Sequence, residues 1–216
     1  MKKKSIIISI CLIFASILFT ILVKNVDVAN IGPNDSSVGF STVNKFFHEL
    51  IGVHMIFYKL TDILGVIPIL MVLGFAIVGL LQVIKRKSIL KVDKEVLALG
   101  VFYITVLVLY IFFEKVIINY RPTLVDGVLE ASYPSSHTLL SLCICGSTII
   151  LNNKLFKKIK IAQYENKVAL IFMILILVGR IISGVHWFTD IMGGTIISIT
   201  LLYIFNTTLS YIQERN

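Results

Sequence analysis

Near the C-terminal end of the sequence, a histidine and an aspartate have the spacing of a reactive pair. His186 and Asp190 are four residues apart in GRIISGVHWFTDIMGG, so on a helix they share one face. A carboxylate that holds one ring nitrogen fixes the tautomer of an imidazole and makes the other nitrogen a better base or nucleophile. We therefore interpret His186 as a candidate nucleophile and Asp190 as its partner.

Arg180 precedes this pair in the same stretch. His186 comes six positions after it, which is a rotation of roughly 240° on a continuous helix. Gly184 lies between them and can break that helix, so that Arg180 ends one helix and His186 opens the next. A structural ion pair is the alternative, but unpaired Arg, His and Asp near lipid are costly, which favours a functional site.

A second basic cluster lies in EKVIINYRPTL, residues 114–124. Lys115 and Arg121 come where an apolar run ends. Pro122 stops a helix and leaves Arg121 in an extended, rigid context. Taken alone, such a cluster is more typical of basic side chains that reach out of a membrane span toward water.

The third cluster is SYPSSHTLL, residues 132–140. Pro134, Ser135 and Ser136 predict a turn before a helix that starts near His137. Serine at a helix start caps the free backbone N–H groups, and the same groups with the positive helix end can bind an anion. A plain capped helix start is the alternative.

The elements that position these clusters are predicted to be membrane-spanning helices. The 216 residues are 57% hydrophobic and only 15% charged, against roughly 25% charged residues in soluble domains. Because about 17–25 apolar residues cross a bilayer as a helix, we predict an all-α polytopic membrane protein, a single domain over residues 1–216. The six predicted spans are 5–23, 63–84, 96–118, 137–153, 168–186 and 190–212.

Basic residues indicate the orientation of this bundle. Fourteen of the twenty Lys and Arg residues fall on one side of the six-span arrangement, the side of both termini. Cytoplasmic loops are enriched in these residues, so we predict cytoplasmic termini in the cell membrane. The net charge of +8 is therefore attributed to membrane topology, and no nucleic-acid partner is expected.

Three further segments have less specific interpretations. The N-terminal apolar run is long for a signal peptide and lacks a clear cleavage site, so we expect a retained span. The outer segment 24–62 is either a surface loop or part of a substrate entrance, and its portion VNKFFHELIGVHMIFYKL is typical of an interfacial amphipathic helix. Cys11, Cys143 and Cys145 lie in apolar runs, where we expect buried side chains without a disulfide or metal.

Counting spans brings the three clusters to one membrane face. The third and fifth spans end there, and the fourth and sixth begin there. Fixed cations, a helix N-terminus and two histidines are suited to phosphoryl transfer, in which charge on the phosphoryl oxygens must be stabilised. His186 can attack phosphorus and His137 can protonate the leaving oxygen. The phosphate would be held by Lys115, Arg121, Ser135, Ser136 and Arg180.

These stretches resemble the signature of the type-2 phosphatidic acid phosphatase superfamily of membrane lipid phosphatases. The signature is Lys before Arg-Pro, then Pro-Ser-Gly-His, then Ser-Arg with His and Asp at fixed spacing. The resemblance covers residues 115–190 and implies a six-helix fold, His186 as nucleophile, Asp190 as its partner and His137 as general acid. It implies no metal and no cofactor.

The sequence departs from that signature at three positions. The family places six residues between the Lys and the Arg, whereas five separate Lys115 from Arg121, and Glu114 occupies the usual position. Ser136 replaces the glycine, which tightens the approach of phosphate. Gly179 replaces the serine before Arg180. None of these changes removes the proposed nucleophile, its partner or the acid.

The expected substrate is a membrane lipid phosphate cleaved at the extracytoplasmic face. Undecaprenyl pyrophosphate, phosphatidic acid and phosphatidylglycerophosphate are candidates that the sequence does not separate. A transporter or proton pathway is the main alternative, although its charges would lie nearer the bilayer midplane. Two further alternatives are a metal site formed by His137, His186 and Asp190, and an inactive relative that only binds lipid. The sequence gives no indication of the oligomeric state.

Overall fold

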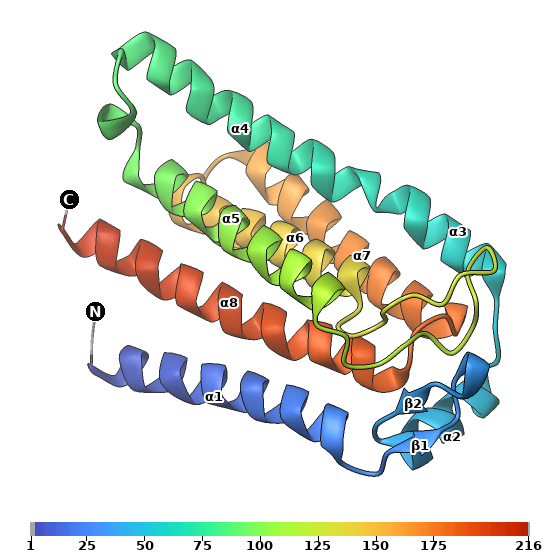
Figure 1. Ribbon diagram of the computed structural model, residues 1–216. Helices are drawn as coiled ribbons and strands as arrows, with labels where there is room; N and C mark the ends of the chain where they lie inside the picture. The colour runs from blue at the N-terminus through green and yellow to red at the C-terminus, as the bar shows by residue number, and fades with distance from the viewer. Residues whose placement is uncertain (1–2, 216) are drawn as a thin grey trace.

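The computed structural model describes residues 3–215 as a bundle of long helices (Figure 1). Six helical segments in this range are long and apolar enough to cross a membrane, which confirms the predicted six-helix architecture. They are α1 (Lys3–Asn25), α3 with α4 (Met55–Leu64 and Val66–Arg86), α5 (Lys94–Lys115), α6 (Ser136–Leu155), α7 (Lys160–Ser183) and α8 (Phe188–Arg215).

Helix α6 lies at the centre of the bundle. In its most apolar stretch 67% of the residues are buried, compared with 6% for α3–α4, whose apolar side chains face outward. Its main neighbours are α7 and α8. The approach to α8 is close because Gly146 has no side chain: a Cβ there would come 2.5 Å from Leu202.

Helix α1 packs along α8 through hydroxyl groups as well as apolar side chains (Figure 1). Ser16 Oγ lies 2.8 Å from Thr200 Oγ1 of α8, and Thr20 Oγ1 lies 2.9 Å from the hydroxyl of Tyr133, in the loop before α6. The hydrogen bond between Ser16 and Thr200 is interhelical, and such bonds help to hold helices together in lipid, where the hydrophobic driving force between helices is absent.

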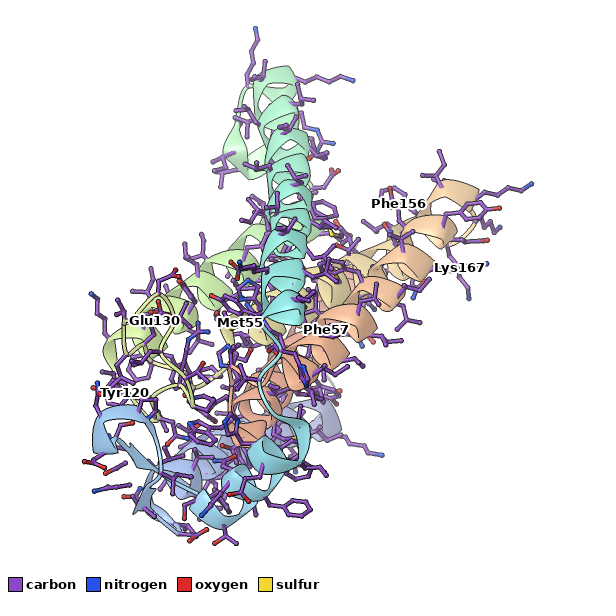
Figure 2. The ribbon with its side chains drawn as sticks, turned by 90° about the vertical axis from the view of Figure 1, so that its right-hand side faces the viewer. Met55, Phe57, Tyr120, Glu130, Phe156 and Lys167 are labelled. Atoms are coloured by element: carbon purple, nitrogen blue, oxygen red, sulfur yellow. The ribbon has the colours of Figure 1, made fainter. Side chains whose placement is uncertain are left out.

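Helices α3 and α4 form one continuous span with unequal contacts. The start of this span packs on α7, whereas α4 diverges from α7 toward the other end of the bundle (Figure 2). An apolar groove of about 830 Å³ lies between α4, α6 and α7, and Met71, Phe156 and Phe172 are among its lining residues. A 3₁₀ turn, Ile89–Lys91, joins α4 to α5.

The segment between the first two spans forms a folded cap at the end of the bundle opposite both termini (Figure 1). It contains the antiparallel strands β1 (Ala29–Asn30) and β2 (Ser37–Val38), a 3₁₀ turn (Pro33–Asp35) and α2 (Ser41–Ile51). The stretch VNKFFHELIGVHMIFYKL, expected to be typical of one amphipathic helix, is divided between two helices, α2 and α3 (Met55–Leu64). The backbone at Gly52 has φ +73°, which ends α2, and α3 then belongs to the second span.

The cap is joined to α8 through Asn44, which is fully buried. Its side-chain oxygen accepts a hydrogen bond from Thr189 N at 3.1 Å, and its nitrogen donates to Thr189 Oγ1 at 2.9 Å and to Gly39 O at 2.8 Å. Asn44 thus satisfies a backbone donor in the first turn of α8, where no intrahelical partner exists. The cap therefore fixes the start of the helix that carries Asp190.

Candidate active site

The connection between α7 and α8 carries His186. Helix α7 ends at Ser183, and Gly184 follows with φ +64°, a left-handed conformation that glycine adopts without strain. This confirms the predicted break at Gly184. A side chain at this position would overlap the carbonyl oxygen of Gly52 in the cap, so the glycine also allows the cap to approach.

The imidazole of His186 is buried and oriented by a backbone carbonyl. His186 Nδ1 lies 3.1 Å from Ser132 O, which can only accept, so Nδ1 carries the proton in the neutral ring. Nε2 is buried and has no hydrogen-bond partner among residues 3–215. The unprotonated Nε2 therefore keeps its lone pair, as a nucleophile requires.

Asp190 lies beside His186 but is hydrogen-bonded elsewhere. Its Oδ2 is 3.7 Å from His186 Nδ1, beyond hydrogen-bond distance, and accepts a 2.8 Å hydrogen bond from Trp187 N. The sequence predicted that Asp190 holds the ring, whereas the structure assigns that hydrogen bond to Ser132. Asp190 can therefore act in two ways. Its hydrogen bond holds the backbone next to His186, and its negative charge would stabilise a positive imidazole.

The electrostatic surroundings keep His186 neutral. Burial is the main reason that its pKa is lowered well below the usual value, and the positive charges of Arg121 and Arg180 and the nearby His137 lower it further. The hydrogen bond to Ser132 O acts in the opposite direction but is the weaker influence. A neutral histidine among cations is suited to attack an anionic phosphate.

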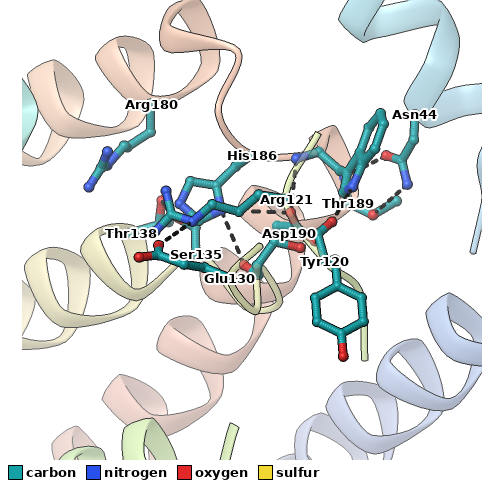
Figure 3. Close-up of polar contacts among 12 residues, drawn as sticks. Asn44, Tyr120, Arg121, Glu130, Ser135, Thr138, Arg180, His186, Thr189 and Asp190 are labelled. Atoms are coloured by element: carbon teal, nitrogen blue, oxygen red, sulfur yellow. Dashed lines mark hydrogen bonds and ion pairs between the residues drawn. The ribbon is translucent and has the colours of Figure 1, made fainter. Parts of the chain in front are cut away.

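Arg121 is held by a hairpin-like loop that joins α5 to α6. Asp126 and Gly127 both have positive φ, 49° and 79°, as in a two-residue type I′ turn. The two arms meet where Arg121 N donates to Glu130 O at 3.0 Å. The Arg121 side chain is buried, and its Nε pairs with Glu130 Oε2 at 3.0 Å. Figure 3 shows this pair next to His186.

Arg180 and His137 meet at a carboxylate that the sequence analysis did not identify. Asp62 Oδ1, on α3, is 3.1 Å from His137 Nε2 and 3.3 Å from Arg180 Nη2. The Arg180 side chain has no exposed surface, and its Cζ lies 5.1 Å from the centre of the Tyr58 ring, also on α3. The second span therefore contributes to the site as well.

The two serines of the second cluster have different positions. Ser136, the first residue of α6, lines a small cavity of about 20 Å³ together with Arg121 and His186. Ser135 is fully buried: its backbone N–H donates to Asp190 O at 3.0 Å, and its hydroxyl accepts from Thr138 Oγ1 at 3.1 Å. Ser135 ties the α6 start to α8, and its hydroxyl does not cap the helix as predicted.

The structure does not bring Lys115 into this cavity. Lys115 is the last residue of α5 and is exposed, whereas the preceding Glu114 lines the cavity beside Arg121. Successive residues on a helix are about 100° apart, so when Glu114 faces the cavity Lys115 turns away. The one-residue shift in the signature thus exchanges a cation for a carboxylate at this position.

Three residues of the site were missed by sequence reasoning: Tyr58, Asp62 and Glu130. Two signals were present. The sequence VDGV predicts a tight hairpin, which would have paired the Arg121 region with that of Glu130. A carboxylate at the edge of an apolar run, as at Asp62, marks a functional position in a membrane protein.

Metal ligation has no clear location in this arrangement. Within the described range 3–215, no three His, Cys, Asp or Glu side chains lie close enough together to hold a metal ion. The alternative of a metal site at His137, His186 and Asp190 therefore has no support from the positions of these side chains.

Fold and site together define a multi-pass membrane protein with buried histidine and arginine side chains at one end of a helical bundle. The sequence matches the family model of the PAP2 superfamily over residues 70–214, about two thirds of the chain, and the protein belongs to that family. The match includes every motif residue from Lys115 to Asp190.

Two individual proteins are similar to this chain. Lipid phosphate phosphatase delta of Arabidopsis thaliana is 31% identical over 84 residues, which are 38% of this chain and 20% of that relative. The crystal structure of a transmembrane PAP2 type phosphatidylglycerolphosphate phosphatase from Bacillus subtilis superposes with a TM-score of 0.56 at 18% identity, covering 94% of this chain and 96% of the other. This second likeness supports the fold.

Proposed function

We propose that this protein is a phosphatase that releases phosphate from a membrane lipid through a phosphohistidine formed on His186. The observation that carries the proposal is the arrangement of His186, a buried neutral imidazole among the cationic side chains of Arg121 and Arg180. Its Nδ1 is held by Ser132 O, and its Nε2 has no hydrogen-bond partner among the described residues 3–215. Membership of the PAP2 superfamily and the likeness to two phosphatases support the same chemistry.

In the first half of the reaction, His186 Nε2 forms a bond to phosphorus as the bond from phosphorus to the leaving oxygen breaks. His137 gives a proton to that oxygen, which leaves as a lipid alcohol or a lipid monophosphate. The positive imidazole that results is stabilised by the carboxylate of Asp190. In the second half, water loses a proton to His137 and attacks phosphorus as the bond from phosphorus to Nε2 breaks. Phosphate is released, and neutral His186 is regenerated.

The phosphoryl oxygens would be held by two guanidinium groups and the start of α6. Arg121 and Arg180 can each donate two parallel hydrogen bonds to phosphate oxygens. Ser136 and the free backbone N–H groups of the first α6 turn add donors and a favourable dipole. Lys115 is not part of this cradle, because its neighbour Glu114 takes the cavity position.

The substrate class follows from the location of the site. The site lies at the end of the spans, where the phosphate of a lipid headgroup would be. The distribution of basic residues favours the extracytoplasmic side for this end. Undecaprenyl pyrophosphate, phosphatidic acid and phosphatidylglycerophosphate are the three lipids that we would assay.

The test is phosphate release by detergent-purified protein in excess EDTA. We expect release from at least one of the three lipids, and a loss of more than about 1,000-fold in His186→Ala, because removal of a nucleophile removes the covalent route. His54→Ala is the matched control: His54 is an exposed histidine of the same end of the bundle and should tolerate the change. Substrate labelled with ³²P should leave an acid-labile, base-stable label on the protein.

Other outcomes would identify the alternatives. Activity that disappears in EDTA would indicate a metal-dependent reaction. Lipid movement across proteoliposomes without hydrolysis would indicate a transporter. Lipid binding by a folded protein that releases no phosphate would indicate an inactive relative.

A further inference from the structure

Asp62 is the one acidic side chain of the α3–α4 span, and its carboxylate lies in the proposed phosphate site. Its Oδ1 is 3.1 Å from His137 Nε2 and 3.3 Å from Arg180 Nη2. In the proposed reaction, Arg180 holds a phosphoryl oxygen and His137 protonates the leaving oxygen. One oxygen that contacts both groups therefore lies where the oxygens of the substrate must be.

Two glycines allow α3 to pack closely enough for Asp62 to contact Arg180 and His137. Gly179, directly before Arg180, leaves room for Thr61 of α3: a Cβ on Gly179 would come 2.5 Å from Thr61 Cγ2. Gly65, which directly follows the last residue of α3, lies against the His137 ring, and a Cβ there would come 3.0 Å from His137 Nε2. The glycine that replaces the serine of the family signature thus lets Asp62 reach the site.

The side chains of Arg180 and Asp62 are buried to different degrees. The Arg180 side chain is 0% exposed, and two of its nitrogens, Nε and Nη1, are buried without a hydrogen-bond partner among residues 3–215. A buried guanidinium requires an anion nearby. The Asp62 side chain is 49% exposed, so it reaches Arg180 from the rim and can move back toward water.

We propose that the Asp62 carboxylate is an internal competitor of phosphate, which pairs with Arg180 and His137 in the free protein and is displaced when an anionic substrate binds. The inference rests on the proposed function, since it names the state of the same site before substrate binds. A carboxylate and a phosphate cannot both contact Arg180 and His137 without strong repulsion. Asp62 therefore lowers the affinity of the site for phosphate and prevents the product from remaining bound.

The experiment compares binding of inorganic phosphate to the wild-type protein and to Asp62→Asn. Trp187 is the only tryptophan of the chain and directly follows His186, so its fluorescence reports on the site. We expect the dissociation constant for phosphate, and its inhibition constant against lipid hydrolysis, to fall by about ten-fold in Asp62→Asn, because the competing charge is removed. We expect KM for the lipid to fall as well.

Two further variants make the comparison specific. Glu49→Gln removes the same charge from the same end of the bundle, at an exposed residue of α2 that pairs with Lys45, and should leave phosphate binding unchanged. Asp62→Ser keeps a small polar group beside Arg180 and should tighten phosphate binding as Asp62→Asn does. It also provides the test if Asp62→Asn does not fold.

The results separate this inference from the proposed function. Unchanged phosphate affinity in both Asp62 variants, with hydrolysis that still requires His186, would overturn the inference alone. A lower kcat with unchanged phosphate affinity would also overturn it, since Asp62 would then serve to position His137. No hydrolysis and no phosphate binding by any of these proteins would overturn both.

Discussion

His186 shows how a single side chain obtains its chemistry from groups far away in the sequence. The carbonyl oxygen of Ser132, 54 residues earlier, accepts a hydrogen bond from its Nδ1–H. Burial and the charges of Arg121 and Arg180 keep the ring neutral. Asp190, four residues later, contributes charge at 3.7 Å, and its Oδ2 accepts a hydrogen bond from Trp187 N. Three separate segments thus set the environment of the nitrogen that we propose as the nucleophile.

The lowered pKa of His186 predicts a specific response to pH. The folded protein takes up a proton on His186 only well below pH 6.5, the ordinary pKa of histidine. The ring therefore stays neutral and competent at mildly acidic pH. The unfolded chain binds this proton near pH 6.5, so the contribution of His186 to the free energy of unfolding is lost as the pH falls below that value.

NMR of ¹³Cε1-labelled histidine checks this prediction. The His186 resonance, assigned by its loss in His186→Ala, should keep the chemical shift of a neutral ring as the pH is lowered through 6.5. A midpoint at or above about pH 6.5 would contradict the lowered pKa.

The connections between helices determine whether the site forms. The α7–α8 connection depends on Gly184 for two reasons. Any side chain there would overlap the Gly52 carbonyl, and the φ of Gly184 is positive. The α5–α6 loop depends on the turn at Asp126 and Gly127. The first connection carries His186 and the second carries Arg121, and both side chains line the same small cavity.

Gly184→Ala should therefore damage both stability and activity. A left-handed alanine alone costs about 1–2 kcal/mol, and the overlap with the cap adds to this cost. We expect a lower midpoint of thermal unfolding and little phosphate release. Gly100→Ala is the control, since Gly100 lies within α5 and a Cβ there would meet nothing within 4 Å. Equal unfolding midpoints for the two variants would refute this role of Gly184.

Asn44→Ala should separate the cap from α8. The variant leaves Thr189 N without its acceptor in a buried position, which costs about 1–3 kcal/mol. We expect faster hydrogen exchange at the start of α8 and reduced activity, because Asp190 lies in that turn. Lys45→Ala, at the exposed neighbouring position of α2, should change neither quantity. Unchanged exchange at Thr189 in Asn44→Ala would contradict the capping role.

The whole molecule gathers its polar site at one end of a bundle whose other end carries both termini (Figure 1). Helix α6 is enclosed by its neighbours, whereas α1 and α3–α4 present apolar side chains outward, as expected for helices that contact lipid. The positive-inside rule then predicts that the cap and the site face the outside of the cell.

Cysteine labelling in intact cells tests this orientation. In a background without the three native cysteines, Lys45→Cys in the cap should react with a membrane-impermeant maleimide, whereas Lys158→Cys between α6 and α7 should react only after permeabilisation. Both positions are exposed, so access depends on the side of the membrane. The reverse pattern would place the site in the cytoplasm.

Much of this protein was determined by its sequence alone. The apolar runs determined six spans because the backbone in lipid must satisfy its own hydrogen bonds, which favours helices. The span count and spacing placed Arg121, His137, Arg180 and His186 at one end. The break at Gly184 also followed from local residue type.

Only the tertiary structure decided the contacts inside that end. Three contacts depend on how segments distant in sequence pack. Ser132 is the partner of His186, and Glu114 rather than Lys115 lines the cavity. Asp62 reaches Arg180 from another helix. Sequence patterns report the period and burial of each helix, but not its rotation against a neighbour. A rotation of one residue, about 100°, decides which side chain enters the site.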